Sequence, residues 1–147
     1  AFIAEKAAAA REGGLIPILC LGETLPTREA GNTLEHIDRQ LQQSFFDAFR
    51  APPSDFVFAY EPIWAIGTGI NATPEQAQEV HAHIRQRLGE IHGLEWAAET
   101  RILYGGSVNP KNAAGLFAQK DIDGGLIGGA SLKSEDFLAI IRAAIAE

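Results

Sequence analysis

Short apolar runs alternate with longer amphipathic segments along the 147 residues. Each apolar run is bounded by Gly, Pro or polar residues and is too short for a buried helix. Runs of this kind are typical of strands that are buried on both faces, as in parallel sheets. The pattern therefore predicts four strands, at residues 15–21, 56–60, 101–104 and 124–127.

The segments between these runs have the periodicity of helices. Ile37, Leu41, Phe45 and Phe49 follow one another at four-residue spacing, which places them on one face of a helix. The predicted helices span residues 1–12, 25–49, 73–91, 109–117 and 134–146.

Capping residues mark several helix ends. Gly13 and Gly14 form a natural end for the first helix. Thr73 is expected to cap the third helix, with Pro74 at its first position and Gln76 completing a capping box. Ser134 is expected to cap the last helix.

A helix followed by four strand–helix pairs predicts an α/β fold with parallel strands and crossover helices. The pattern alone is compatible with an open, doubly wound sheet or with a closed (β/α)8 barrel. No Gly-x-Gly-x-x-Gly follows the first strand, which weakens a dinucleotide-binding interpretation. With no linker or low-complexity tract, residues 1–147 are expected to form a single domain.

Composition narrows the class of partner. Hydrophobic residues make up 46% of the chain, as in a soluble globular protein, and the net charge is -7. This charge argues against a nucleic-acid surface, which needs a basic patch, and gives no attraction to anionic membranes. No apolar run is long enough to span a membrane. Residues 1–14 read as an amphipathic helix and not as a signal peptide.

Cys20 is the only cysteine, so no intramolecular disulfide can form, which fits a cytoplasmic location. We expect Cys20 to be a small buried residue without a nucleophilic role, because no neighbouring base is evident. The sequence holds no Met, even at position 1. We therefore expect a chain that is processed, trimmed or numbered from an internal point.

Glu61 is the candidate catalytic acid or base. It follows the apolar strand 56–60 directly, and Pro62 restricts its backbone. A lone carboxylate at a strand end, followed by the Gly-rich loop that includes residues 67–69, suits a general base with a closing lid. The alternative is a structural acid at a strand-to-helix turn.

Two glycine pairs follow the last two predicted strands. Ser107 comes after Gly105-Gly106, and its amide and hydroxyl can both donate to a phosphate oxygen. Gly128 and Gly129 can expose successive N–H groups that form an anion-binding concavity. Each pair alone is usually a turn, but two pairs at successive strand ends favour a phosphate site.

Four motifs together resemble the triosephosphate isomerase family. They occur in the family's order and are found at residues 20–24 (CLGET), 59–69 (AYEPIWAIGTG), 104–110 (YGGSVNP) and 123–132 (DGGLIGGASL). The resemblance covers essentially the whole chain but only the second half of the family's length. It implies a parallel (β/α)4 half of a TIM (β/α)8 barrel, preceded by one helix.

The resemblance also implies an activity. Family members interconvert dihydroxyacetone phosphate and glyceraldehyde 3-phosphate, in glycolysis and gluconeogenesis, by proton transfer through an enediolate. Glu61 occupies the position of the family's base. Gly67, Ser107, Gly128 and Gly129 occupy its phosphate-binding positions. No metal or cofactor is implied, and the expected substrate is a small phosphorylated triose.

The sequence departs from the family in two respects. Ile70-Asn71 stands where a Lys-Thr or Lys-Val pair is usual, which affects the expected lid kinetics. No motif matches the family's lysine and histidine, which belong to strands before Ala1. We therefore expect the isolated chain to be weakly active or inactive. The alternative is a non-catalytic phosphate-binding or folding half-barrel.

Half a barrel has open sheet edges, which invite pairing. We expect the chain to form a homodimer in which its first and fourth strands pair, or to associate with a separate N-terminal half.

The remaining polar and aromatic residues have structural interpretations. The resemblance suggests an ion pair between Arg85 and Asp121. Trp64 and Trp96 are expected to be packing residues, with Trp64 helping to hinge the lid. The four histidines fall on predicted helices and are expected to be solvated: His36, His81, His83 and His92.

Overall fold

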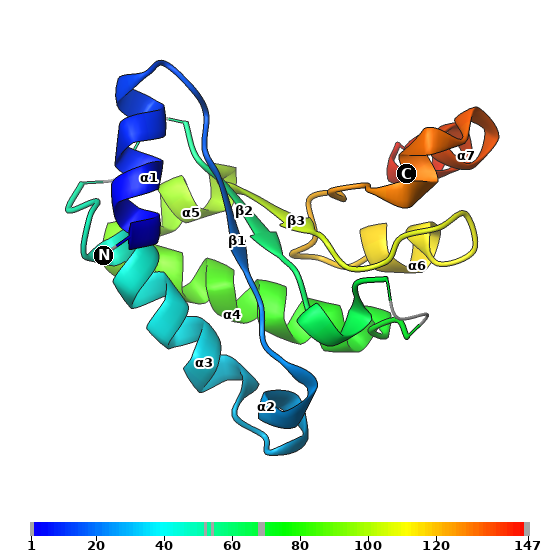
Figure 1. Cartoon of the computed structure of the whole chain (residues 1–147), viewed down its shortest axis with the longest axis horizontal. Coiled ribbons are helices and arrows are strands. Elements are labelled where there is room, and N and C mark those ends of the chain that lie inside the picture. The colour runs from blue at the N-terminus through cyan, green and yellow to red at the C-terminus, as the bar shows by residue number, and fades with distance from the viewer. Residues whose placement is uncertain (1, 52, 54, 68–69, 146–147) are drawn as a thin grey trace.

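The computed structural model describes residues 2–51, 53, 55–67 and 70–145. Its centre is a parallel sheet with the strand order β1-β2-β3. The strands are β1 (Ile18–Leu21), β2 (Val57–Tyr60) and β3 (Arg101–Tyr104). Figure 1 shows α1, α3, α4 and α5 grouped beside the sheet, while α6 and α7 lie together beyond the end of β3.

The three strands start and end at the same height in the sheet, so their residues pair one to one. Ile18 pairs with Val57, which pairs with Arg101, and at the other end Leu21, Tyr60 and Tyr104 lie side by side. The carboxyl ends of all three strands therefore lie at the same end of the sheet, and the loops that follow the strands begin there.

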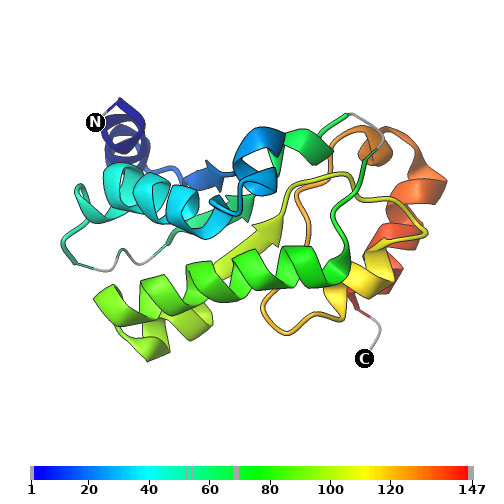
Figure 2. The same cartoon turned by 90° about the horizontal axis from the view of Figure 1, so that it is seen from below.

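The helices lie mainly between the strands in sequence (Figures 1 and 2). Their bounds are α1 Phe2–Glu12, α2 Leu25–Glu29, α3 Thr33–Leu41, α4 Pro74–His92, α5 Leu94–Glu99, α6 Ala113–Phe117 and α7 Ser134–Ala144. Shorter turns are a π-helical turn η1 Gln42–Phe46 and two 3-10 turns, η2 Ile63–Ala65 and η3 Gly129–Leu132. Among the residues described, no helix has both the length and the apolarity needed to cross a bilayer.

The predicted helix 25–49 is interrupted. Gly31, with a φ of 73°, separates α2 from α3, and α3 continues into η1. The predicted apolar stripe is confirmed, because Ile37, Leu41 and Phe45 are fully buried and Phe49 is nearly so.

Helix capping agrees with the sequence at one position and differs at another. The Gln76 N–H donates to Thr73 Oγ1 at 3.2 Å, and the Thr73 N–H donates to Gln76 Oε1 at 3.0 Å, which confirms the capping box. Ser134 is the first residue of α7 and not its cap. Lys133 occupies the cap position and makes no side-chain cap bond. The sequence did not predict α5.

The predicted fourth strand, residues 124–127, is wrong as a strand. Only an isolated bridge forms, between Tyr104 and Gly125. It is held by two bonds, from the Tyr104 N–H to Gly124 O and from the Leu126 N–H to Tyr104 O, both 2.9 Å. Gly124 has a φ of 150°, outside the extended backbone of a strand, so the ladder does not continue.

The two faces of the sheet differ. Side chains from alternate positions, such as Leu21, Phe58 and Tyr104, are buried on the face that packs against α3 and α4. On the other face Ile18 is 48% exposed. Cys20 was predicted to be buried and is exposed, because the strand's alternation places it on this second face.

An aromatic cluster joins η1 to β2. Phe45 is its centre, with ring centroids 4.8 Å from Phe56 and 4.9 Å from Phe58. The Trp96 ring stacks on Phe45 at 6.0 Å and its Nε1 donates to Pro53 O at 2.9 Å. The predicted packing role of Trp96 is confirmed.

Candidate active site

Glu61 lies where β2 leaves the sheet. Its N–H donates to Leu21 O at 2.7 Å, and the Gly105 N–H donates to Tyr60 O at 2.8 Å. These two bonds extend the ladders beyond the strands. Glu61 is therefore fixed between the ends of β1 and β3.

The side chain of Glu61 lies between Gly105 and Cys20. A Cβ added to Gly105 would be 2.5 Å from Glu61 Cγ and 3.1 Å from its Oε1. On the other side, although Cys20 as a residue is exposed, partial desolvation of its thiol and a hydrogen bond with the Glu61 carboxylate raise the pKa of the thiol to about 11. The expectation that Cys20 has no neighbouring base is therefore wrong, because the Glu61 carboxylate lies beside it, but with this raised pKa the thiol is protonated at neutral pH.

A cavity of about 280 Å³ adjoins Glu61. Its wall includes all four residues that the sequence assigned to phosphate binding: Gly67, Ser107, Gly128 and Gly129. They come from three separate loops: one follows β2, one follows β3, and the third follows the bridge that Gly125 makes with Tyr104 of β3. Glu61 does not line this cavity, but Gly105, against which it packs, does.

The backbone conformation of Gly67 and a backbone hydrogen bond of Ser107 determine which groups face the cavity. Gly67 has a φ of 66°, which glycine adopts readily. The rest of the expected lid tip, residues 68–69, lies outside the described residues. The Ser107 N–H donates to Ala65 O at 3.1 Å, so in this arrangement Ser107 offers its hydroxyl, not its amide, to a ligand.

Glu23 is a residue of this region to which the sequence analysis gave no role. Its carboxylate is fully buried and accepts bonds from Tyr60 OH at 3.1 Å and from Trp64 Nε1 at 2.9 Å. Trp64 belongs to η2, which connects Glu61 to Gly67. The available signal was its position, because Glu23 follows a strand as Glu61 does.

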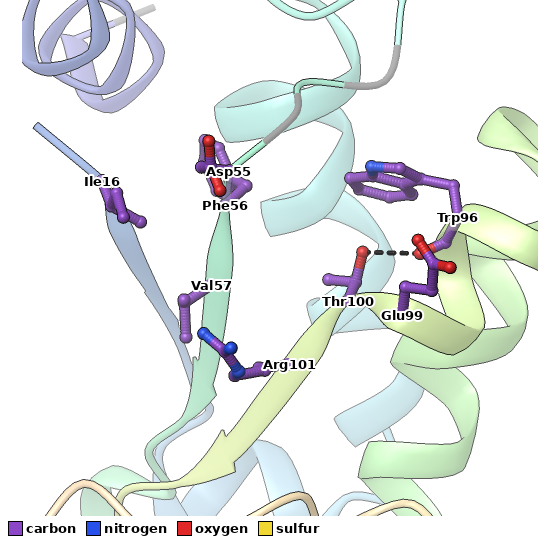
Figure 3. A pocket seen from close by; sticks show the side chains of 8 residues that line it. All are labelled: Ile16, Asp55, Phe56, Val57, Trp96, Glu99, Thr100 and Arg101. Atoms are coloured by element: carbon purple, nitrogen blue, oxygen red, sulfur yellow. Dashed lines mark hydrogen bonds between the residues drawn. The ribbon is translucent and has the colours of Figure 1, made fainter. Parts of the chain in front are cut away.

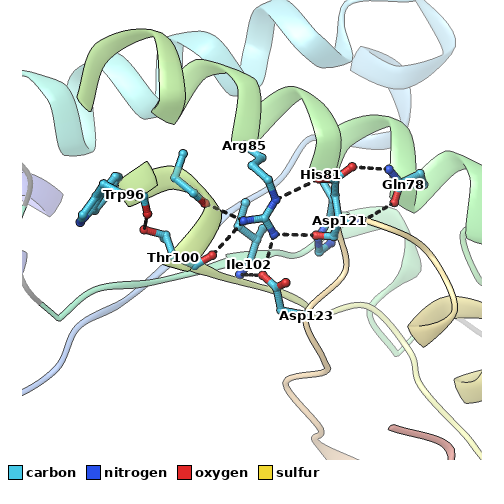
Figure 4. Close-up of polar contacts among 9 residues, drawn as sticks. Gln78, His81, Arg85, Trp96, Thr100, Ile102, Asp121 and Asp123 are labelled. Carbon is cyan, nitrogen blue, oxygen red and sulfur yellow. Dashed lines mark hydrogen bonds and ion pairs between the residues drawn. The ribbon is translucent and has the colours of Figure 1, made fainter. Parts of the chain in front are cut away.

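The predicted pair of Arg85 and Asp121 is confirmed, with Nε and Oδ1 2.9 Å apart (Figure 4). Arg85 also binds the Asp123 carboxylate at 2.7 Å. The same Asp123 oxygen accepts the Ile102 N–H of β3 at 2.7 Å. This network fastens the segment before Gly124 to both α4 and β3, and thereby positions the chain that leads to Gly128.

His81 was predicted to be solvated and is fully buried. It lies on the face of α4 that covers the sheet, beside the rings of Tyr60 and Tyr104. Its Nδ1 is 3.2 Å from Asp121 O, and burial lowers its pKa to about 4.

Two other histidines also make specific contacts. His83 Nε2 is 2.9 Å from Asp38 Oδ1, and the His92 ring packs against Phe45. Burial lowers the pKa of His92.

A second cavity, of about 130 Å³, opens at the other end of the sheet (Figure 3). Its lining comes from residues at the strand starts and from α5: Ile16, Asp55, Phe56, Val57, Trp96, Glu99, Thr100 and Arg101. It contains none of the predicted site residues. Of these two cavities, only the one at the carboxyl ends of the strands contains predicted site residues.

Comparison with known proteins identifies the family. A family model described as triosephosphate isomerase matches residues 1–144. The chain belongs to the triosephosphate isomerase family. Its residues 59–69 and 104–110, which carry Glu61 and Ser107, lie within the matched range.

Individual triosephosphate isomerases are similar over nearly the whole chain. The enzyme of Pseudomonas putida is 59% identical over 140 residues, which are 95% of this chain and 55% of the relative. The enzyme of Thermus thermophilus is 52% identical over 144 residues, 98% of this chain and 58% of the relative. The chain thus spans little more than half the length of the triosephosphate isomerases that it matches.

Proposed function

We propose that this chain supplies the base and the phosphate-binding wall of a triosephosphate isomerase active site. It would do so as a (β/α)4 half of a TIM barrel, in which residues 1–147 form one partial domain. The observation that carries the proposal is the single cavity lined by Gly67, Ser107, Gly128 and Gly129, beside Glu61.

In the proposed reaction Glu61 moves one proton. Its carboxylate removes a proton from C1 of dihydroxyacetone phosphate, the C–H electron pair forms the C1=C2 bond, and the electron pair of the C2=O bond moves onto O2 to give an enediolate. A proton then passes from the C1 hydroxyl to O2, the C1=O bond forms, and Glu61 returns its proton to C2 through the C1=C2 electron pair, which gives glyceraldehyde 3-phosphate. The phosphate would be held by the N–H of Gly67, the hydroxyl of Ser107 and the backbone of Gly128 and Gly129.

We expect the chain by itself to show little or no isomerase activity. The family's lysine and histidine have no counterpart among these 147 residues, and such groups stabilise the charge of the enediolate. The test is an isomerase assay on glyceraldehyde 3-phosphate with Glu61→Ala as control. Activity that Glu61→Ala abolishes would show that Glu61 works with other groups, such as residues of a partner chain.

Phosphate binding tests the other half of the proposal. Titration with inorganic phosphate, followed by NMR of the backbone amides, is expected to shift Gly67, Gly128 and Gly129 at millimolar phosphate. Ser107→Ala is expected to weaken binding, and Ser44→Ala serves as a matched control because Ser44 belongs to η1 and does not line this cavity. No shift at these glycines would reject the phosphate site.

The proposed partner is a second copy of the chain or a separate N-terminal half of a barrel. Supporting this, β1 is the edge of the sheet, and Ile18 and Cys20 on its uncovered face are exposed. Sedimentation of the chain alone, and after mixing with the part of the Pseudomonas putida enzyme that it does not match, separates the two. A monodisperse monomer in both experiments would reject the proposal.

A non-catalytic, phosphate-binding half-barrel is the second candidate function. It is favoured by the exposed residues of β1 together with the cavity that contains all four proposed phosphate-binding residues. Phosphate binding without any Glu61-dependent activity, alone or in the mixture, would establish it.

A further inference from the structure

Arg28 connects three separate parts of the molecule at the beginning of the proposed lid. It belongs to α2, and its side chain is only 16% exposed. Its Nη1 lies 3.4 Å from Glu23 Oε1, and its guanidinium carbon lies 5.3 Å from the centre of the Trp64 ring. Its Nη2 also lies 3.9 Å from Glu79 of α4, which is largely exposed.

The contact with Glu23 compensates a buried charge. The Glu23 carboxylate is fully buried, and two of the groups that donate to it, Tyr60 OH and Trp64 Nε1, are neutral. An ionised carboxylate that is buried without a cation is strongly unfavourable. Arg28 supplies that cation within the part of the chain that the structure describes.

The contact with Trp64 connects the same cation to the loop of the cavity. Trp64 is in the middle of η2, and Ile66 and Gly67 follow it into the cavity wall. The neighbouring Ala65 O accepts the Ser107 N–H at 3.1 Å. A displacement of η2 would therefore move Gly67 and release the Ser107 amide together.

We propose that Arg28 is a positioning residue for the phosphate site, because it holds Trp64 against Glu23 and so fixes where Gly67 and Ser107 stand at the cavity. Arg28 does not line the cavity and acts only through η2. The proposal rests on the proposed phosphate site for its effect on binding, but its effect on Trp64 is independent of any ligand.

The geometry requires an arginine. A planar guanidinium can pair with the Glu23 carboxylate while its face lies over the Trp64 ring, and a lysine ammonium is a point charge that cannot do both in this way. Arg28→Lys should thus retain the charge compensation and lose part of the hold on Trp64. Arg28→Gln should lose both.

The experiment uses the chain labelled with 5-fluorotryptophan. Its two tryptophans give two 19F resonances, from Trp64 at the hinge and Trp96 in the aromatic cluster, so Trp96 is an internal control. A Trp96→Phe variant assigns them. Each variant is also titrated with inorganic phosphate. Arg39→Gln is the matched control, because it removes the same charge from an exposed position of the neighbouring helix α3.

Arg28→Gln is expected to shift and broaden the Trp64 resonance, to leave that of Trp96 unchanged, and to weaken phosphate binding about fivefold. Arg28→Lys should give an intermediate result, and Arg39→Gln should match the parent chain. The proposal is overturned if the Trp64 resonance of Arg28→Gln does not move, even if its melting temperature falls.

The two proposals fail differently. If the parent chain binds no phosphate, the proposed phosphate site is wrong, and the Trp64 resonance alone decides whether Arg28 positions η2. If the Trp64 resonance moves but phosphate binding does not change, Arg28 holds Trp64 in place without affecting the phosphate site. The proposal that Arg28 positions Gly67 and Ser107 is then wrong.

Discussion

Gly105 lies so close to Glu61 that no other residue fits at this position without displacing the carboxylate. A Cβ there would be 2.5 Å from Glu61 Cγ and 3.2 Å from its Cδ. The glycine at the end of β3 therefore determines where the side chain at the end of β2 stands.

Gly105→Ala is expected to push Glu61 away from its present position and weaken its hydrogen bond with Cys20. The pKa of the Cys20 thiol should then fall from about 11, because the carboxylate contributes to raising it. The pH dependence of the reaction of Cys20 with a thiol reagent measures this. Gly115→Ala in α6 is the control, where a Cβ would meet only Pro74 Cγ at 3.4 Å. An unchanged thiol titration in Gly105→Ala would contradict the geometry.

Glu23→Gln is expected to lower the free energy of unfolding by about 1–3 kcal/mol. The amide loses the ion pair with Arg28, and its NH2 group cannot accept the bond from Tyr60 or Trp64. Urea unfolding measures the difference. Glu29→Gln, on the exposed surface of α2, should change stability by less than about 0.5 kcal/mol. Equal effects of the two substitutions would show that the buried contacts of Glu23 contribute nothing.

Arg85→Met is expected to cost about 3 kcal/mol, because it leaves the nearly buried Asp121 and its neighbour Asp123 without their cation. The substitution also removes donors to Ala97 O and Thr100 O. Thermal or urea unfolding tests this against Arg142→Met at an exposed position of α7. If Arg85→Met unfolded like the control, the network would be a surface feature without a role in stability.

The pH dependence of stability should contain a contribution from His81. Its pKa is about 4 in the folded chain and 6.5 when unperturbed, so the unfolded chain binds the proton more readily. The contribution of neutral, buried His81 to the free energy of unfolding is fully present above pH 6.5. It is lost as the pH falls toward 4, by about 3 kcal/mol at most.

Unfolding of the parent chain and of His81→Gln between pH 4 and 7 isolates this contribution. The free energy of unfolding of His81→Gln should depend less steeply on pH than that of the parent chain. His36→Gln, at a less buried position of α3, should keep the pH dependence of the parent chain. Parallel curves for parent and His81→Gln would mean that His81 titrates normally.

The sequence predicted the elements whose pattern is local. The four-residue spacing of Ile37, Leu41 and Phe45, and the capping box of Thr73 and Gln76, each depend on neighbours along the chain, and both are confirmed. Ser107 and the pair Gly128-Gly129 were proposed as phosphate-binding residues from glycine pairs near predicted strand ends, and Gly67 from the family resemblance; their role stays a prediction. That all four line one cavity depends on how β2, β3 and the bridge at Gly125 lie side by side, which no local pattern contains.

The errors come from tertiary packing. Whether residues 124–127 form a strand depends on how far pairing with β3 extends, and the structure shows one bridge. Whether Cys20 and His81 are buried depends on which face of the sheet the helices cover. The structural role of Glu23 depends on the hydrogen bonds that its carboxylate accepts from Tyr60 and Trp64, which are distant in the sequence.

The aromatic cluster around Phe45 has a kinetic consequence. Phe45, Phe49, Phe56 and Phe58 are near neighbours in the sequence, so bringing their rings together closes only a short loop. We expect this contact to form early, and to hold β2 in place before β1 and β3 are recruited to its two sides. The strand that carries Glu61 would then be the first part of the sheet to fold, and Phe45→Leu would slow folding more than it would accelerate unfolding.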